Sequence, residues 1–159
     1  MNVSQCMKSN AVSIVVSASI QEAAQLFVQH HIGTLPVLDD SDRLVGILHM
    51  RDLLKLVMPA FVDLIPDFDF VEADFGVFEE LTISEDAAIT PVRDLMETAV
   101  AVQANSGLLR AFAFLNSHDL YDLPVVDADG RLVGLASRVD IGTALLNRWQ
   151  NNPLTGPTP

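Results

Sequence analysis

The chain has 159 residues, half of them hydrophobic, and a formal net charge of −12 at pH 7. The hydrophobic residues supply enough apolar surface for one domain, or for two small domains that share a core. The negative charge disfavours nucleic acid and anionic lipid as partners, and no apolar run reaches the ~18 residues of a membrane-spanning helix. The polar first ten residues lack the apolar segment of a signal peptide, and the single cysteine, Cys6, excludes an intrachain disulfide. We therefore expect a protein of the reducing cytoplasm.

The first elements along the chain form a β-α-β-β-α string. Residues 12–16 are a β-branched run typical of a strand, and Ser17 is placed to cap the helix that follows. Residues 35–38 and 44–48 read as buried strands joined by a polar turn, and residues 51–58 as a closing helix. The apolar residues of the first helix follow helical spacing: Ile20, Ala23, Ala24, Phe27 and Val28.

An acidic segment, residues 59–90, separates this string from the next. Nine of the 21 acidic residues lie between Lys55 and Arg93, where there is no Lys, Arg or His. Five of the eight Phe residues lie there too, which is unlike a plain disordered acidic tail. We expect the Phe residues to dock on the rest of the protein or on a second subunit, as a lid or partner-binding element. For the acidic side chains we favour a solvated face over a cation site at residues 67–74, because the pattern lacks the central Gly and closing Glu of a calcium loop.

The second string repeats the order of the first. Residues 100–102 open it, Asn105 is placed to cap a helix, and residues 123–126 and 132–136 read as strands. A last helix covers 139–149, and the tail 150–159 reads as unstructured. The apolar residues of the first helix in this string are Leu108, Ala111, Phe112 and Leu115.

The two strings are copies of one unit. Leu35-Pro36-Val37-Leu38-Asp39 returns as Leu123-Pro124-Val125-Val126-Asp127, Arg43-Leu44-Val45-Gly46 as Arg131-Leu132-Val133-Gly134, and Asp52 as Asp140, all at a spacing of 88 residues without a gap. Further upstream, VSQCM at 3–7 echoes VRDLM at 92–96 with one extra residue. Ala23 and His30 also return at the spacing of 88 residues, as Ala111 and His118. A register kept over these thirty residues indicates an internal duplication.

This unit resembles the cystathionine-β-synthase-type (CBS) domain, whose core pattern is matched at 35–52 and 123–140. The resemblance implies an α/β (α+β) fold, in which two tandem repeats pack their sheets about a pseudo-two-fold axis. We divide the chain into repeat 1 (1–58), the acidic Phe-rich insert (59–90), repeat 2 (91–149) and the tail. Such pairs commonly associate further, so we expect a homodimer.

The resemblance also implies a ligand site between the repeats for AMP, ADP, ATP or S-adenosylmethionine. In repeat 2 the motif is complete: Asp140 would accept hydrogen bonds from the ribose hydroxyls, and Ser137 and Arg138 would face a phosphate. The adenine would lie near Val100, Ala101, Tyr121, Leu123 and Pro124. The same Ser-x-x-Asp spacing is also that of a helix-capping box, and the two roles are compatible.

Repeat 1 departs from the motif, because His49 stands where a hydroxyl residue is expected. Asp52 could still hold ribose with Thr34 nearby, and His49 and Arg51 could reach phosphates as cations. The alternative is an empty first site in which Asp52 only starts a helix.

The sequence leaves two main functional hypotheses. In the first, the chain is a regulatory sensor that binds an adenine nucleotide and acts through an unknown target protein. In the second, it is a ligand-free dimerising scaffold whose contact surface is the insert. An enzyme is disfavoured, because Cys6 has no activating base at a recognisable spacing and no P-loop, G-x-G-x-x-G or zinc-ligand set is present.

Overall fold

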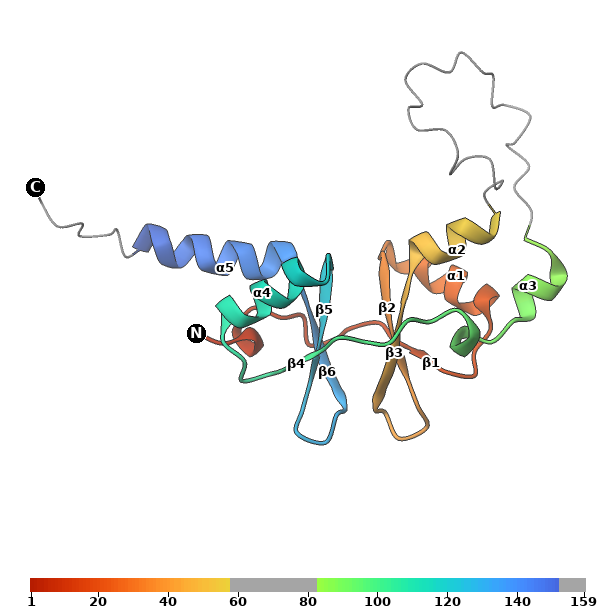
Figure 1. Ribbon diagram of the computed structural model, residues 1–159, viewed down its shortest axis with the longest axis horizontal. Helices are drawn as coiled ribbons and strands as arrows, with labels where there is room; N and C mark the ends of the chain where they lie inside the picture. The colour runs from red at the N-terminus through yellow and green to blue at the C-terminus, as the bar shows by residue number, and fades with distance from the viewer. Residues whose placement is uncertain (58–82, 152–159) are drawn as a thin grey trace, which may run out of the picture.

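Two three-stranded sheets stand side by side in the middle of the molecule, with helices on their two outer sides (Figure 1). The computed structural model describes residues 1–57 and 83–151. Within them the predicted mixed architecture of two β-α-β-β-α repeats is confirmed.

Repeat 1 consists of β1 (Ile14–Val15), α1 (Ile20–His30), β2 (Thr34–Leu38), β3 (Leu44–His49) and α2 (Met50–Val57). Strand β2 is central, with β1 parallel to it on one side and β3 antiparallel on the other. Four of the five β2 residues are buried, as expected for a strand covered on both faces.

Repeat 2 has the same plan. Its elements are β4 (Val102–Gln103), α4 (Leu108–Ser117), β5 (Asp122–Val126), β6 (Leu132–Ser137) and α5 (Arg138–Asn151). The strand register matches that of repeat 1, since Thr34 lies opposite His49 and Asp122 lies opposite Ser137. The ladder shifts after Val37 in one copy and after Val125 in the other, so even the irregularity is repeated.

Only the end of the insert belongs to the described residues. There α3 (Glu85–Ile89) contacts α1, and the Ser84 hydroxyl accepts the Ala87 amide at 3.2 Å as the cap of the helix. The five Phe residues and the carboxylates of 67–74, for which docking and a solvated face were predicted, lie outside the described residues, as does 152–159 of the tail.

The helix starts correct two of the predicted caps. Helix α1 is capped by Ser19 rather than Ser17, because the Ser19 hydroxyl accepts the Glu22 amide at 3.2 Å while Glu22 accepts the Ser19 amide at 2.7 Å. Helix α4 begins after Gly107, not Asn105. The α1 stripe is also narrower than predicted, since Val28 is 73% exposed.

The two hairpin turns form as predicted, each around an aspartate. Oδ1 of Asp39 accepts two backbone amides, at 2.8 Å and 3.0 Å, and Oδ1 of Asp127 accepts the equivalent pair, both at 2.9 Å. Each turn has one residue with positive φ, Asp42 at 59° and Gly130 at 80°. The hairpin tips meet, since the Leu44 amide donates to the Gly130 carbonyl at 3.0 Å.

The short segments that open the two repeats are exchanged between them. The 3-10 helix Val3–Gln5 packs on repeat 2, where the Val3 side chain is fully buried in the core and its amide donates to the Ser106 carbonyl at 2.9 Å. The equivalent 3-10 helix, Val92–Asp94, contributes Val92 to the core of repeat 1. Figure 1 shows the N-terminus beside α4, on the side of repeat 2. The core of each repeat is therefore completed by the short segment that opens the other repeat.

The exchanged segments run close over the central hairpins. The Lys8 amide and carbonyl bond the main chain of Leu135, at 2.9 Å and 3.0 Å. A Cβ on Gly134 would lie 2.8 Å from the Lys8 carbonyl oxygen and 2.7 Å from the Met7 sulfur. Gly46 stands in the same relation to Met96 and to the Glu97 carbonyl. Neither glycine has a positive φ, so these positions need glycine for the close packing and not for its backbone conformation.

Gly134→Ala is expected to lower the free energy of unfolding by about 1–3 kcal/mol, the usual cost of overpacking, because main chain cannot move aside as a flexible side chain does. Gly142→Ala is the matched control. Nothing lies within 4 Å of its Cβ position in α5, so we expect a gain of up to about 1 kcal/mol from helix propensity. Urea unfolding of both variants measures the difference; equal values would contradict the close approach.

Candidate functional site

A cleft of about 340 Å³ opens between the two repeats. Repeat 1 contributes the start of β2, the end of β3 and the start of α2, and repeat 2 contributes the loop from α4 to β5. The lining residues are Gly33, Thr34, His49, Met50, Arg51, Leu54, Asp119, Leu120, Tyr121 and Asp122. A larger and shallower hollow of about 520 Å³ lies on α1 alone and is lined by no charged residue. Another hollow of about 340 Å³ lies between the repeats at the hairpin turns, and none of its lining residues belongs to the predicted site. The cleft at His49 is the better candidate, because it brings polar and charged groups of both repeats together with four of the predicted residues.

His49 is the most buried ionisable side chain that lines this cleft. It is 8% exposed, and its Nδ1 lies 3.5 Å from the Thr34 hydroxyl. Its Nε2 is shielded from solvent and has no hydrogen-bond partner among the residues that the structure describes. Burial, followed by the charge of Arg51, lowers the pKa of His49, and the carboxylates of Asp52, Glu97 and Asp122 oppose this shift. The side chain is therefore neutral near pH 7.

Asp52 acts at the start of α2. Its Oδ2 accepts the His49 amide at 3.2 Å, and its Oδ1 lies 3.4 Å from Lys55 Nζ and 4.0 Å from Arg51 Nε. The carboxylate is buried, so these contacts hold it in place. The helix-start role predicted as the alternative for Asp52 is thus present, and Arg51 points from the same turn into the lining of the cleft.

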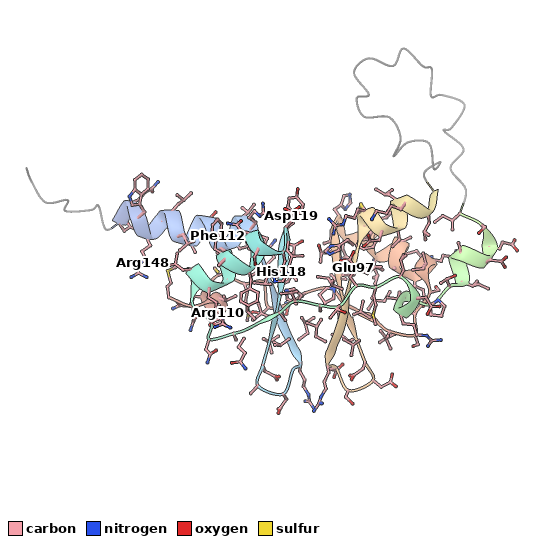
Figure 2. All side chains as sticks on the ribbon, viewed as in Figure 1. Glu97, Arg110, Phe112, His118, Asp119 and Arg148 are labelled. Atoms are coloured by element: carbon pink, nitrogen blue, oxygen red, sulfur yellow. The ribbon has the colours of Figure 1, made fainter. Side chains whose placement is uncertain are left out.

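Repeat 2 contributes an acidic wall and one aromatic ring. Asp119 and Asp122 line the cleft together with Tyr121, which is 70% exposed. Figure 2 labels Asp119 near the end of α4, at the same end of the two sheets as α2. The cleft therefore combines Arg51 and a buried imidazole on one side with two carboxylates on the other.

The Arg138 side chain makes its contacts within its own repeat, repeat 2. One terminal nitrogen donates to the Leu120 carbonyl at 2.9 Å and lies 3.7 Å from the Asp119 carboxylate. The guanidinium also lies 5.3 Å from the centre of the Tyr121 ring. Arg138 thus ties the loop that lines the cleft to the first turn of α5. The phosphate-facing role of Arg138 stays a prediction beside these contacts.

Ser137 and Asp140 form a reciprocal capping box at the start of α5. The Ser137 hydroxyl accepts the Asp140 amide at 3.0 Å, and Asp140 Oδ2 accepts the Ser137 amide at 3.0 Å and its hydroxyl at 2.6 Å. Oδ1 of Asp140 has no hydrogen-bond partner within residues 1–57 and 83–151. One carboxylate oxygen thus holds the helix start while the other remains available, which is how capping and ligand binding can coexist.

The residues expected around the adenine lie in different surroundings. Leu123 is fully buried in the core of repeat 2, and Pro124 is buried beside it in β5. Val100 and Ala101 are partly buried before β4. Of the twelve predicted site residues, the cleft brings together Thr34, His49, Arg51 and Tyr121.

Asp119 and Asp122 were not predicted as site residues. A signal for them was present, because they lie 88 residues after His31 and Thr34 and so occupy the same places in the fold. His31 and Asp119 share a left-handed backbone, with φ of 52° and 49°. Their side chains differ between the copies, so matching identical residues passed over them.

The described residues also bear on three other kinds of site: a reactive thiol, a metal site and a membrane-spanning helix. Burial, with a smaller effect of the Asp140 charge, raises the pKa of Cys6, which keeps the thiol protonated and unreactive. Within residues 1–57 and 83–151 no group of three or more His, Cys, Asp or Glu side chains could hold a metal ion. None of the helices described is long and apolar enough to cross a membrane.

A family model described as CBS domain matches residues 3–59 and 92–147. The chain is 32% identical over 136 residues to the chloroplastic CBS domain-containing protein CBSX2 of Arabidopsis thaliana, a match covering 82% of this chain and 56% of that protein. The chain thus spans a little over half the length of this plant relative. A match to homoserine O-acetyltransferase of Methanocorpusculum labreanum, at 27% identity, covers only 22% of that enzyme.

Solved structures share the fold. The crystal structure of CBSX2 from Arabidopsis thaliana superposes with a TM-score of 0.73 at 29% identity, covering 94% of this chain and 97% of that one. CBSX2 has also been crystallised in complex with AMP, and that structure matches with a TM-score of 0.69 over 92% of this chain and 97% of the other.

Proposed function

Because this chain belongs to the CBS-domain family, we propose that it is a regulatory module that binds an adenine nucleotide between its repeats and acts through a partner protein. The observation that carries the proposal is the cleft itself. It lies between the repeats, it has a volume suited to a small molecule, and both repeats contribute polar groups to it. A relative of similar sequence, CBSX2, forms a complex with AMP.

The proposal gives each part of the site a task. Tyr121 offers an exposed ring for stacking on a base. Arg51 offers a cation for phosphate, and Asp140, which is not among the residues that line the cleft, offers its unused Oδ1 to the ribose hydroxyls. Catalysis is not part of the proposal.

A ligand that binds only the folded state must stabilise it. We expect AMP, ADP, ATP or S-adenosylmethionine to raise the melting temperature of the purified protein, with about 2.7 kcal/mol of stabilisation at a hundredfold excess over Kd. Thermal shift with each ligand, followed by calorimetry for affinity and stoichiometry, measures this. Ribose 5-phosphate, which lacks the adenine, is the control and should give a smaller shift than AMP.

If none of the four ligands shifts the melting temperature at millimolar concentration, the sensor proposal fails. The alternative is then the dimerising scaffold, in which the repeats serve only to present contact surfaces. Sedimentation with and without nucleotide separates the two, because a scaffold keeps one oligomeric state in both conditions.

A further inference from the structure

The buried imidazole of His49 has no task in the contacts described so far. It lies at the end of β3, immediately before α2, at the place where Ser137 ends β6 in the other copy. Ser137 closes a capping box with its hydroxyl, whereas the structure shows no bond from the His49 side chain to Asp52. The imidazole lines the cleft instead.

The hydrogen bond between the His49 ring and Thr34 fits both protonation states of the ring. A neutral imidazole has one donor nitrogen and one acceptor, while an imidazolium has two donors. The Thr34 hydroxyl, 3.5 Å from Nδ1, can donate to a neutral ring or accept from a charged one. On the other side of the ring, Nε2 is buried and unpartnered within the described residues. A proton on this ring therefore needs compensation from a negative charge nearby.

The charges that surround His49 decide when that compensation is present. Arg51 repels a second positive charge, while Asp52, Glu97 and Asp122 attract one. The Asp52 carboxylate is shared with Lys55 and Arg51, which weakens its effect on the imidazole. Burial then leaves the ring neutral in the ligand-free protein. An anion that binds at Arg51 would remove the repulsion and supply the missing negative charge together.

We propose that His49 makes ligand binding in this cleft proton-linked, so that a phosphate-bearing nucleotide binds more tightly as the pH falls. Charge balance in the cleft supports the linkage. Asp119 and Asp122 are the only charged residues of the lining besides Arg51, and Asp119 is also 3.7 Å from Arg138, so a phosphate enters a site that has no excess of positive charge. Protonation of His49 supplies a positive charge, and water screens it less than the exposed charges of the cleft because the ring is buried.

The inference rests on the proposed function, and AMP is the probe for both. We expect AMP to bind at least about threefold more tightly at pH 6.5 than at pH 8.0, with a ceiling of tenfold per pH unit for one linked proton. Calorimetry in two buffers of different ionisation enthalpy should show proton uptake on binding. Adenosine, which lacks the phosphate, should bind without it.

His49→Ser is the matched variant, because it gives repeat 1 the residue that repeat 2 carries at the same place. It should bind AMP with no His-dependent proton uptake, leaving only the titration of the phosphate itself, whose second pKa is near 6. His118→Gln, which changes a histidine outside the cleft, should behave as the wild type.

Ligand-free protein gives a second measurement. Since the folded-state pKa of His49 lies below its unfolded value of about 6.5, the unfolded chain takes up a proton first as the pH falls. The contribution of His49 to stability is thus full above pH 6.5 and is lost as the pH falls through the folded-state pKa. Urea unfolding across this range should show the loss in the wild type and not in His49→Ser.

The outcomes are distinct. AMP binding with equal proton uptake in the wild type and His49→Ser overturns the inference and leaves the proposed function standing. Proton uptake that is lost in His49→Ser supports both. No AMP binding to either protein at either pH overturns both, even if the ligand-free stability follows the expected pH dependence.

Discussion

Val3→Asp is expected to lower the free energy of unfolding by about 3–5 kcal/mol, although the residue lies at the extreme N-terminus. Val3 is fully buried in the core of repeat 2, among side chains that include Leu108 and Val125. A carboxylate placed there loses its hydration and finds no charged partner in that cluster, which costs several kcal/mol. Urea unfolding measures the loss.

The location of the damage separates this explanation from a general effect of an added charge. Hydrogen exchange should rise first in β5 and β6, which Val3 helps to cover, and less in the strands of repeat 1. Val28→Asp is the matched control, because Val28 is 73% exposed on α1 and its change should stay within about 0.5 kcal/mol. A Val3→Asp protein as stable as this control would show that the N-terminal segment does not complete the second core.

Much of the fold could be predicted because the same short patterns occur twice. The strands around Pro36 and Pro124 and the aspartates of the two turns follow from local preferences and from the repeat register. The caps were less accessible. Ser17 and Ser19 both suit a helix start, and only Ser19 has a glutamate three residues later, a signal that the sequence contained and that the prediction did not use.

The exchange of the opening segments is a different case. The similarity of residues 3–7 to 92–96 predicts that the two segments are equivalent, but it does not state which core each one covers. That choice depends on the path of the chain between the sheets and on the fit of Met7 and Met96 over Gly134 and Gly46. Long-range contacts of this kind are not encoded by local spacing, so only the structure reveals them.

The site shows the same division between local and long-range information. The capping box at Ser137 and Asp140 follows from spacing in one strand and helix. The cleft needs residues from both repeats, and its acidic wall of Asp119 and Asp122 arises where the copies differ. Comparing the two copies of a duplicated sequence reveals the residues that both copies share. The acidic wall of the cleft consists of residues at which the copies differ, so that comparison does not find it.

Asp140→Asn is expected to weaken AMP binding roughly 10- to 100-fold while it costs the fold only about 1 kcal/mol. The asparagine oxygen can still accept the Ser137 amide, so the start of α5 is largely kept, at the usual price of a weakened cap. Binding loses more, because the ribose hydroxyls would meet a neutral amide in place of a charged acceptor, and a hydrogen bond to a charged group contributes about 1.5–3 kcal/mol. Calorimetry with AMP measures the affinity, and urea unfolding measures the stability.

Asp129→Asn is the control for this variant, since it removes one negative charge from an exposed turn at the far end of the sheets from the cleft. Its AMP affinity should match that of the wild type. Wild-type affinity in Asp140→Asn, with the small loss of stability retained, would mean that the carboxylate serves α5 alone.

Asp52→Asn extends the test to repeat 1, where the carboxylate is already shared among the His49 amide, Lys55 and Arg51. Because those contacts occupy both of its oxygens, we expect Asp52→Asn to affect AMP affinity less than Asp140→Asn does, and the order of the two effects identifies which repeat holds the ribose.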